Sequence, residues 1–354
     1  MSRILIIDSL YRRQGNFELR DISFRVENGE IYTILGPSGA GKTTLLDCIA
    51  GFRKVHSGKI ILDNKDITYL PPEKRDIAYI PQEPALFPHM SIMENIEYGL
   101  RVKKVAREER ERLIRDLASS LGINNILDKY PREISGGEKQ RVALARALVI
   151  DPKLMLMDEP LAHLDAPLRK ELRKEIRREI KPRGVSTIYV THDQSEAFMI
   201  ADRIAIMKDG VILDENTPLG ILESPKSIFS AKFLGYENLF KAQVVDASKD
   251  ITRVTIGDVE LLVPGRHTGE LYIGFRPEDV VIFITEPTSS IRNILEGEIV
   301  EVLIGGSTAR VIVDVGVKIT ALITRRALRD LDLKIGKHVL IGIKSTSIKI
   351  LRED

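Results

Sequence analysis

Apolar residues occur in short runs at several places in the first 235 residues, and polar or charged residues bound each run. Runs of this length are typical of strands that are buried on both faces of a parallel sheet. The N-terminal sequence MSRILIIDSL has the pattern of a further, first strand. The predicted buried strands cover residues 31–35, 154–157 and 188–190.

The apolar spacing becomes helical between these runs. It predicts a packed helix at residues 44–50, and residues 93–123 combine helical periodicity with a heavily charged outer face. Residues 168–180 have the pattern of an amphipathic helix that ends before a proline and a glycine. The alternation of helices and strands predicts a parallel α/β domain for residues 1–235.

The pattern changes after about residue 236, where short apolar runs recur between Gly, Pro and Asp turns. This spacing predicts small all-β barrels. The sequences IGFRPEDV at 273–280 and IGIKSTSI at 341–348 share one frame of glycine, basic and apolar positions. We therefore expect residues 236–354 to form a β domain of two related OB-like halves, at about 236–288 and 289–354.

The composition limits what the chain can do. Its 354 residues include 53 Lys and Arg against 51 Asp and Glu, so net charge gives no case for nucleic-acid binding. No apolar run has the length of a membrane span, and the N-terminus lacks a signal-peptide pattern, so we expect a cytoplasmic chain. Cys48 is the one cysteine, and we expect it to fill space in the core.

The stretch GPSGAGKTT at residues 36–44 joins the strand at 31–35 to the following helix. Its glycines allow a tight turn with inward N–H groups, and the helix start adds a partial positive charge. The complete GxxxxGK[ST] spacing predicts a phosphate cradle, in which Lys42 reaches the β- and γ-phosphates and the Thr43 hydroxyl suits Mg²⁺. The predicted nucleotide contacts are Gly36, Pro37, Ser38, Gly39, Ala40, Gly41, Lys42, Thr43 and Thr44.

Three further strand ends carry polar residues that suit the same phosphates. The sequence LMLMDEP at 154–160 places Asp158 to hold Mg²⁺, with Glu159 beside it to orient and deprotonate the attacking water. His192 closes another strand and can donate a hydrogen bond to the γ-phosphate. Gln82 offers its amide to Mg²⁺ or to the attacking water. The predicted catalytic residues are therefore Lys42, Gln82, Glu159 and His192, and the predicted Mg²⁺ ligands are Thr43, Gln82 and Asp158.

Ser135, Gly136 and Gly137 open a helix within the sequence ISGGEKQR at 134–141. This is a second anion-binding helix start in the same chain. One nucleotide cannot easily use both helix starts within a monomer. A nucleotide site shared between two copies of the chain therefore becomes attractive.

This ordered set of motifs resembles the ATPase subunits of ABC transporters over residues 1–235. In that resemblance the glycine-rich loop is Walker A, the Asp158 strand is Walker B, Gln82 is the Q-loop residue and His192 is the switch histidine. The expected fold is accordingly the ABC-type α/β P-loop NTPase domain, followed by the all-β OB-like, molbindin-like domain.

The resemblance also assigns residues that spacing alone does not. Tyr11 looks like the aromatic residue that stacks on adenine, with Phe17 as the alternative, and Leu164-Asp165 looks like the D-loop, which makes Asp165 a nucleotide-site residue. The family often has serine where this chain has Ala162. One contact across the dimer is therefore expected to differ.

The resemblance implies how such a chain works. Two subunits sandwich two ATP molecules, Walker A of one faces Ser135–Gly137 of the other, and hydrolysis reopens the pair. A helical subdomain at about 83–134 would contact an integral-membrane permease, with residues 84–90 at the coupling groove. The implied cofactors are ATP and Mg²⁺. The implied partners are a second copy, the permease and, indirectly, an extracellular oxyanion-binding protein, which places the chain at the cytoplasmic side of the cell membrane.

The C-terminal segments SSIRNILEGEIVEV (289–302) and IGIKSTSI (341–348) resemble the molybdate-binding module of molbindins. They offer charged and neutral donors with no carboxylate beside them, which suits a tetrahedral dianion. This resemblance implies a molybdate/tungstate importer ATPase that the oxyanion inhibits through the C-terminal domain. The candidate oxyanion residues are Ser290, Arg292, Asn293, Lys344 and Ser345.

Three other functions stay open. The same machine could serve a sugar, sulfate or a polyamine. A non-transport ABC ATPase of DNA repair or translation fits less well, because only about 90 residues separate the two glycine motifs and the chain has one ATPase half. An oxyanion store that lost transport would not need Glu159 and His192.

Overall fold

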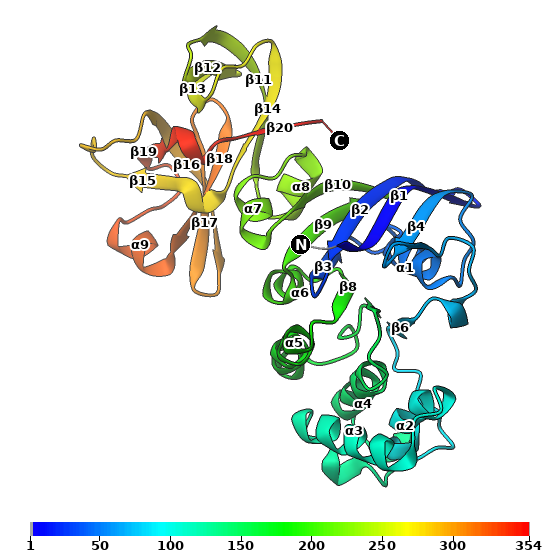
Figure 1. Ribbon diagram of the computed structural model, residues 1–354. Helices are drawn as coiled ribbons and strands as arrows, with labels where there is room; N and C mark the ends of the chain where they lie inside the picture. The colour runs from blue at the N-terminus through cyan, green and yellow to red at the C-terminus, as the bar shows by residue number, and fades with distance from the viewer. Residues whose placement is uncertain (1–2, 354) are drawn as a thin grey trace. The chain divides into compact units, whose positions relative to one another are not determined.

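The computed structural model describes residues 3–353 and separates into two compact units, Met1–Ile221 and Leu222–Asp354 (Figure 1). The first unit combines a parallel sheet with helices, and the second is built on antiparallel sheets. The predicted fold class, α/β followed by an all-β region, is confirmed. No helix among residues 3–353 has the length and apolar character that a membrane span requires.

A six-stranded sheet of order β10-β9-β3-β8-β7-β6 forms the centre of the first unit. Five strands are parallel and β10 pairs antiparallel at one edge. The carboxyl ends of the parallel strands therefore meet at one edge of the sheet. The strands are β3 (Ile31–Leu35), β6 (Ile77–Ile80), β7 (Leu154–Asp158), β8 (Ser186–Thr191), β9 (Arg203–Lys208) and β10 (Val211–Asn216).

Both faces of this sheet are buried, which explains the continuous apolar runs. In β7, Leu154 and Leu156 pack in a core that includes α1 and the second sheet of this unit. Met155 and Met157 point to the opposite face and pack against α4 and α5. The second sheet has the order β2-β1-β4-β5. Its strands are β1 (Arg3–Gln14), β2 (Phe17–Glu27), β4 (Ser57–Leu62) and β5 (Lys65–Asp66).

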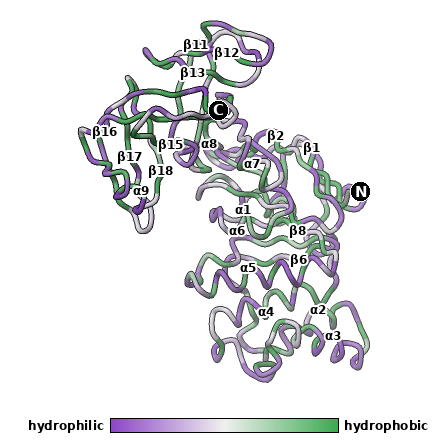
Figure 2. The backbone as a smooth tube through the Cα atoms, turned by 90° about the vertical axis from the view of Figure 1, so that its left-hand side faces the viewer, coloured by the Kyte–Doolittle hydropathy of each residue, from purple (hydrophilic) through white to green (hydrophobic). Residues whose placement is uncertain are grey.

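The charged region with helical periodicity at 93–123 forms two helices, α2 and α3. α2 begins at the Ser91 capping box, and the chain turns through Lys104, which has a φ of 60°, before α3 begins. α5 matches the amphipathic prediction, and its hydropathy alternates along the tube in Figure 2. The helices of this unit are α1 (Lys42–Ala50), α2 (Ile92–Val102), α3 (Arg107–Ser120), α4 (Gly136–Leu148), α5 (Ala166–Ile180) and α6 (Gln194–Ile200).

The second unit contains two five-stranded sheets around one core, in the orders β13-β12-β11-β14-β20 and β15-β19-β16-β17-β18. The short helices are α7 (Pro218–Glu223), α8 (Ile228–Phe233) and α9 (Arg325–Asp330). The first five strands are β11 (Asn238–Ala247), β12 (Ile251–Ile256), β13 (Val259–Pro264), β14 (Glu270–Phe275) and β15 (Val280–Phe283). The next five are β16 (Asn293–Gly305), β17 (Thr308–Asp314), β18 (Lys318–Thr324), β19 (His338–Ile343) and β20 (Lys349–Leu351).

The internal echo corresponds to a symmetric exchange of strands. β14 and β19 are equivalent, and each is followed by a 3₁₀ turn and a short strand. That short strand crosses over: β15 pairs with β19, and β20 pairs with β14. The expected division into contiguous halves at 288/289 therefore needs a correction, because each sheet takes one strand from the other half of the sequence.

Candidate active site

The loop at residues 36–41 turns sharply at the end of β3. A side chain on Gly36 would collide with the Met207 carbonyl of β9, so only glycine fits there. Gly41 precedes α1 with a φ of 101°, and a side chain there would collide with Phe17. The close approach of these neighbours shapes the loop around the start of α1, where the first-turn N–H groups have no intrahelical partners.

Lys42 lies inside this loop and is 4% exposed. Its Nζ donates to the carbonyls of Gly36 and Pro37 at 2.9 Å each. The same ammonium lies 3.3 Å from Glu159 Oε1. The loop thus holds one buried positive charge at the N-terminus of α1, facing the carboxylate of Glu159 after β7.

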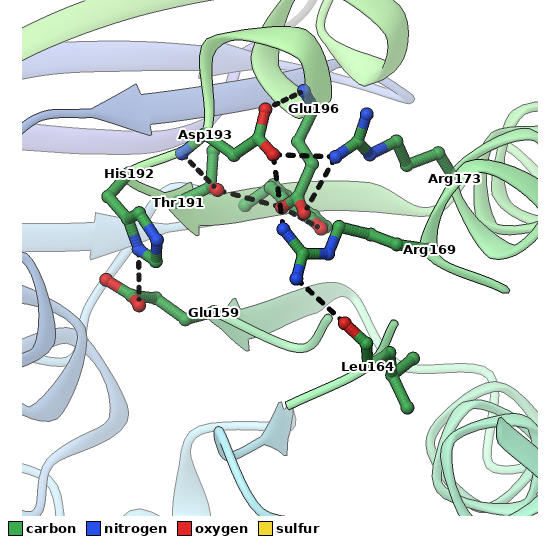
Figure 3. Close-up of polar contacts among 9 residues, drawn as sticks. Glu159, Leu164, Arg169, Arg173, Thr191, His192, Asp193 and Glu196 are labelled. Carbon is green, nitrogen blue, oxygen red and sulfur yellow. Dashed lines mark hydrogen bonds and ion pairs between the residues drawn. The ribbon is translucent and has the colours of Figure 1, made fainter. Parts of the chain in front are cut away.

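Glu159 stands between Lys42 and His192. Its Oε2 atom is 2.8 Å from His192 Nδ1, and Figure 3 shows the two side chains facing each other. Glu159 has a φ of 44°, and its N–H donates to the Val190 carbonyl at 3.0 Å. This left-handed backbone costs a residue other than glycine about 1–3 kcal/mol.

Asp158 ends β7 and is 5% exposed. Thr43 Oγ1 donates to its Oδ1 at 3.1 Å, and the Tyr79 hydroxyl donates to its Oδ2 at 3.3 Å. Burial raises the pKa of the Asp158 carboxyl, the hydrogen bonds from Thr43 and Tyr79 oppose this, and the Glu159 charge adds to it. A buried carboxylate beside a second one, with a threonine hydroxyl in contact, is a donor set that suits Mg²⁺.

A cavity of about 340 Å³ opens beside these groups. Gln82, which follows β6, lines it. Phe17 also lines it, whereas Tyr11 does not: Tyr11 donates to Glu18 at 3.3 Å and packs near His56. Of the two aromatic candidates, the alternative Phe17 therefore lines this cavity and Tyr11 does not. The lining residues are Phe17, Ser38, Gly39, Gly41, Lys42, Thr43, Thr44, Gln82 and Glu159.

The second glycine motif lies at the start of α4. Ser135 caps this helix and forms a reciprocal capping box with Glu138. Ser135, Gly136 and Gly137 are absent from the lining of the cavity at Lys42. Asp165 caps α5, where its carboxylate accepts the Leu168 N–H at 2.9 Å. The structure thus separates these two helix starts from the Lys42 cavity within the chain.

A second cavity of about 420 Å³ lies between β6 and the helices α2 and α4. Its wall includes Tyr79, Phe87 and Tyr98, and it takes in residues of the stretch predicted at 84–90. Arg146 of α4 stacks on Phe87 and donates to the Ala85 carbonyl at 2.7 Å. The groove is therefore mainly apolar and aromatic with one cation at its rim.

The candidate oxyanion residues lie in the second unit. The β16–β19 ladder ends at the pair Asn293–Ile343, and Arg292 and Lys344 adjoin these two residues in the sequence. Both are exposed, and among residues 3–353 neither has a carboxylate within ion-pair distance. Ser290 is also exposed, and Ser345 is partly buried.

Asn293 has a different place from the one expected. Its carboxamide is buried and hydrogen-bonds the backbone of Leu262, accepting at 2.7 Å and donating at 3.1 Å. Asn238, at the equivalent start of β11, makes the same pair of bonds with Thr320. Asn293 is therefore corrected from an anion donor to one of two symmetric clamps between the sheets.

Sequence reasoning missed Tyr79, which is an apolar-run residue in β6 whose hydroxyl reaches Asp158. It also missed the arginines of α5 that surround Asp193. The spacing of four between Arg169, Arg173 and Arg177 was the available signal, since these positions share one helix face.

The loop, the paired carboxyl groups and the histidine at one sheet edge define the class of a P-loop nucleoside triphosphatase. Comparison with known proteins narrows this class. The family model described as ABC transporter matches residues 19–162, and the TOBE domain model matches residues 289–350. The chain belongs to the ABC transporter family, and it is the ATP-hydrolysing subunit of an importer.

Several relatives extend over most of the chain. The molybdate/tungstate import ATP-binding protein of Pyrococcus horikoshii is 40% identical and covers 98% of this chain and 99% of its own length. The Fe(3+) ions import ATP-binding protein of Fusobacterium nucleatum is 36% identical, covering 100% of this chain and 95% of its own. The spermidine/putrescine import ATP-binding protein of Thermotoga maritima is 45% identical, covering 66% and 63%.

A solved structure shares the fold of the first unit. CbiO1 from Clostridium perfringens, part of an ABC transporter complex, has a TM-score of 0.58 and 30% sequence identity. The match covers 62% of this chain and 91% of that one.

Proposed function

We propose that this chain powers the uptake of molybdate or tungstate through a separate membrane permease. The observation that carries the proposal is the similarity to the Pyrococcus horikoshii protein, because it continues through the C-terminal unit. The spermidine/putrescine relative covers a smaller share of the chain. The iron relative is also full-length, so import of iron is the second candidate.

The proposed hydrolysis follows from the contacts of Glu159. When ATP binds, its γ-phosphate takes the place of the Glu159 carboxylate beside Lys42, because both anions would pair with the same Lys42 ammonium. Glu159 then turns to the attacking water as general base, and Gln82 helps to orient that water. His192 donates to a γ-phosphate oxygen. Phe17 offers its ring to adenine.

Magnesium would be held by Thr43, Asp158 and Gln82. When bound, the ion neutralises charge that builds on the β- and γ-phosphate oxygens. The buried Asp158 carboxyl, with its raised pKa, supports this assignment because a divalent cation would relieve the cost of its charge.

The complete site is proposed to form between two copies of the chain. The start of α4 then faces the phosphates bound by the other copy, with Asp165 near the same interface. The aromatic groove at Tyr79, Phe87 and Tyr98 is proposed to receive a segment of the permease, which would hold the chain against the cytoplasmic side of the membrane. An extracellular oxyanion-binding protein would deliver the cargo to that permease.

The C-terminal unit is proposed to bind the oxyanion and slow the ATPase. Arg292 and Lys344, which adjoin the last pair of the β16–β19 ladder, supply two positive charges, and Ser290 and Ser345 supply hydroxyl donors. A dianion between the two cations would remove their mutual repulsion. The TOBE domain match over this segment supports the assignment.

The test is titration calorimetry of the full-length chain with tungstate and molybdate, with sulfate as the comparison anion, followed by ATPase assays at saturating oxyanion. Binding that Lys344→Gln abolishes and Lys318→Gln leaves intact is expected, with ATP hydrolysis reduced. Lys318 is an exposed lysine of the same unit. Absence of tungstate and molybdate binding, together with unchanged ATPase rates, would overturn the regulatory proposal.

A further inference from the structure

A polar network lies behind His192, on the side away from Glu159. α5 carries Arg169 and Arg173 one helical turn apart, and both reach the residue that follows His192 (Figure 3). Arg173 donates to Asp193 Oδ2 at 2.7 Å. Arg169 pairs with the same oxygen at 3.5 Å. Two cations from one helix therefore converge on the turn that carries the switch histidine.

The same network fixes the backbone on both sides of His192. Thr191 accepts the Asp193 N–H at 3.0 Å and donates to the Glu196 carboxylate at 2.8 Å. Asp193 caps α6 by accepting the Glu196 N–H at 3.2 Å. Glu196 is 3% exposed and lies 3.5 Å from Arg173. Removing the Arg173 guanidinium would take the neighbouring positive charge away from the buried Glu196 carboxylate, which is costly.

The arginine helix also contacts the two loops that the proposed dimer brings to the second nucleotide. Arg169 donates to the Leu164 carbonyl in the D-loop at 2.8 Å. A side chain on Gly137, in the second glycine motif at the start of α4, would collide with Leu168 of α5, so the two helices touch closely there. Arg141 of α4 pairs with Glu175 at 3.0 Å. α5 therefore links α4, the D-loop and the turn at His192.

We propose that Arg169 and Arg173 are positioning residues for ATP hydrolysis, which act through Asp193 to hold His192 in register with Glu159. Neither arginine lines the Lys42 cavity, and their effect on the reaction passes through the turn. Because α5 also contacts α4 and the D-loop, the same helix connects the turn at His192 to the two loops of the proposed dimer interface. The inference rests on the proposed role of His192 in hydrolysis.

The test measures ATPase kinetics of Arg173→Met in the wild-type and the His192→Ala backgrounds. In the wild-type background kcat should fall about tenfold with KM changed less than about twofold, the split expected for a group that acts on the transition state alone. In the His192→Ala background the same substitution should change kcat less than about twofold, because residues that act in series are not additive. Arg177→Met is the matched control: Arg177 lies on the same face of α5 but pairs with Asp202 at 3.0 Å.

A second variant guards against misfolding. Asp193→Asn keeps the shape and the helix cap but removes the charge that the arginines face. Asp193→Asn should lower kcat about as much as Arg173→Met does in the wild-type background. In the His192→Ala background it should change kcat less than about twofold. Thermal melting of each variant reports folding separately from activity.

The outcomes separate this inference from the proposed function. If His192→Ala hydrolyses ATP at the wild-type rate, the role given to His192 fails, and this inference fails with it. If His192→Ala is impaired while folded Arg173→Met and Asp193→Asn are not, this inference alone is wrong. A full loss from Arg173→Met on top of His192→Ala would also overturn it, since the arginine would then act elsewhere.

Discussion

Replacing Glu159 by glutamine should strengthen ATP binding while it stops hydrolysis. In the structure the Glu159 carboxylate lies 3.3 Å from Lys42 Nζ, and the lysine side chain is only 3% exposed. At an effective dielectric constant of 20 the attraction of two unit charges at this distance is about 5 kcal/mol. The loop carbonyls and the remaining water offset most of this attraction. For the net contribution of the Lys42–Glu159 pair we therefore take the value of a charged hydrogen bond, about 1.5–3 kcal/mol.

The γ-phosphate has to displace this carboxylate from Lys42, so Glu159→Gln should bind ATP roughly 10- to 100-fold more tightly. Loss of the general base should lower kcat about 10²- to 10⁴-fold. The tightly bound nucleotide should then hold two copies together, which size-exclusion chromatography with ATP would detect.

Affinity is measured by titration with a fluorescent ATP analogue, and hydrolysis by phosphate release. The control is Glu111→Gln in α3, which removes an exposed ion pair of 2.9 Å with Arg107 and should change neither quantity. Unchanged hydrolysis in Glu159→Gln would refute the general-base role. Unchanged or weaker nucleotide binding would refute the competition for Lys42.

Three further predictions test individual contacts. Phe17→Ala should weaken ATP binding about tenfold, within the roughly 1–3 kcal/mol of an aromatic–base stack, while Tyr11→Ala should change it less than about twofold in the same titration. Because burial raises the pKa of the Asp158 carboxyl, the stability linked to this group is present below the unfolded pKa of about 3.9 and is lost as pH rises through the folded value. Asp158→Asn should therefore raise the melting temperature of the magnesium-free protein at pH 7 and not at pH 3.5, and an unchanged melting temperature at pH 7 would contradict this. Asn293→Ala should destabilise the second unit by about 2–5 kcal/mol in denaturant titrations, since it leaves the N–H and C=O of Leu262 without their partners, and a loss under about 1 kcal/mol would show that water replaces them.

The sequence was sufficient wherever local spacing determines the structure. β3, β7 and α5 follow from apolar runs and helical periodicity, because both faces of the sheet are buried and one side of α5 meets it. The GPSGAGKTT loop could also be predicted from the sequence, because the nearby Met207 carbonyl leaves room only for glycine at position 36. Burial of Cys48 also agrees with expectation, and it raises the pKa of the thiol to about 11.

The sequence was insufficient where the partner is distant along the chain. Tyr11 and Phe17 are six positions apart, and only the pairing of β1 with β2 and β4 decides which ring reaches the cavity. Asn293 reads as a polar residue before a strand, but its partner Leu262 lies 31 positions away. Neither spacing nor propensity reports such a contact.

The exchange of β15 and β20 gives the second unit an order of assembly during synthesis. β11–β14 leave the ribosome early, yet the edge of β14 is covered only by residues 349–351. Until then that edge presents unpaired backbone groups that a neighbouring nascent chain can bind. β15 likewise has to wait for β19. Neither sheet can close before the other is nearly finished, so a ribosome that stalls late in this region releases a chain with two open sheets rather than one folded half.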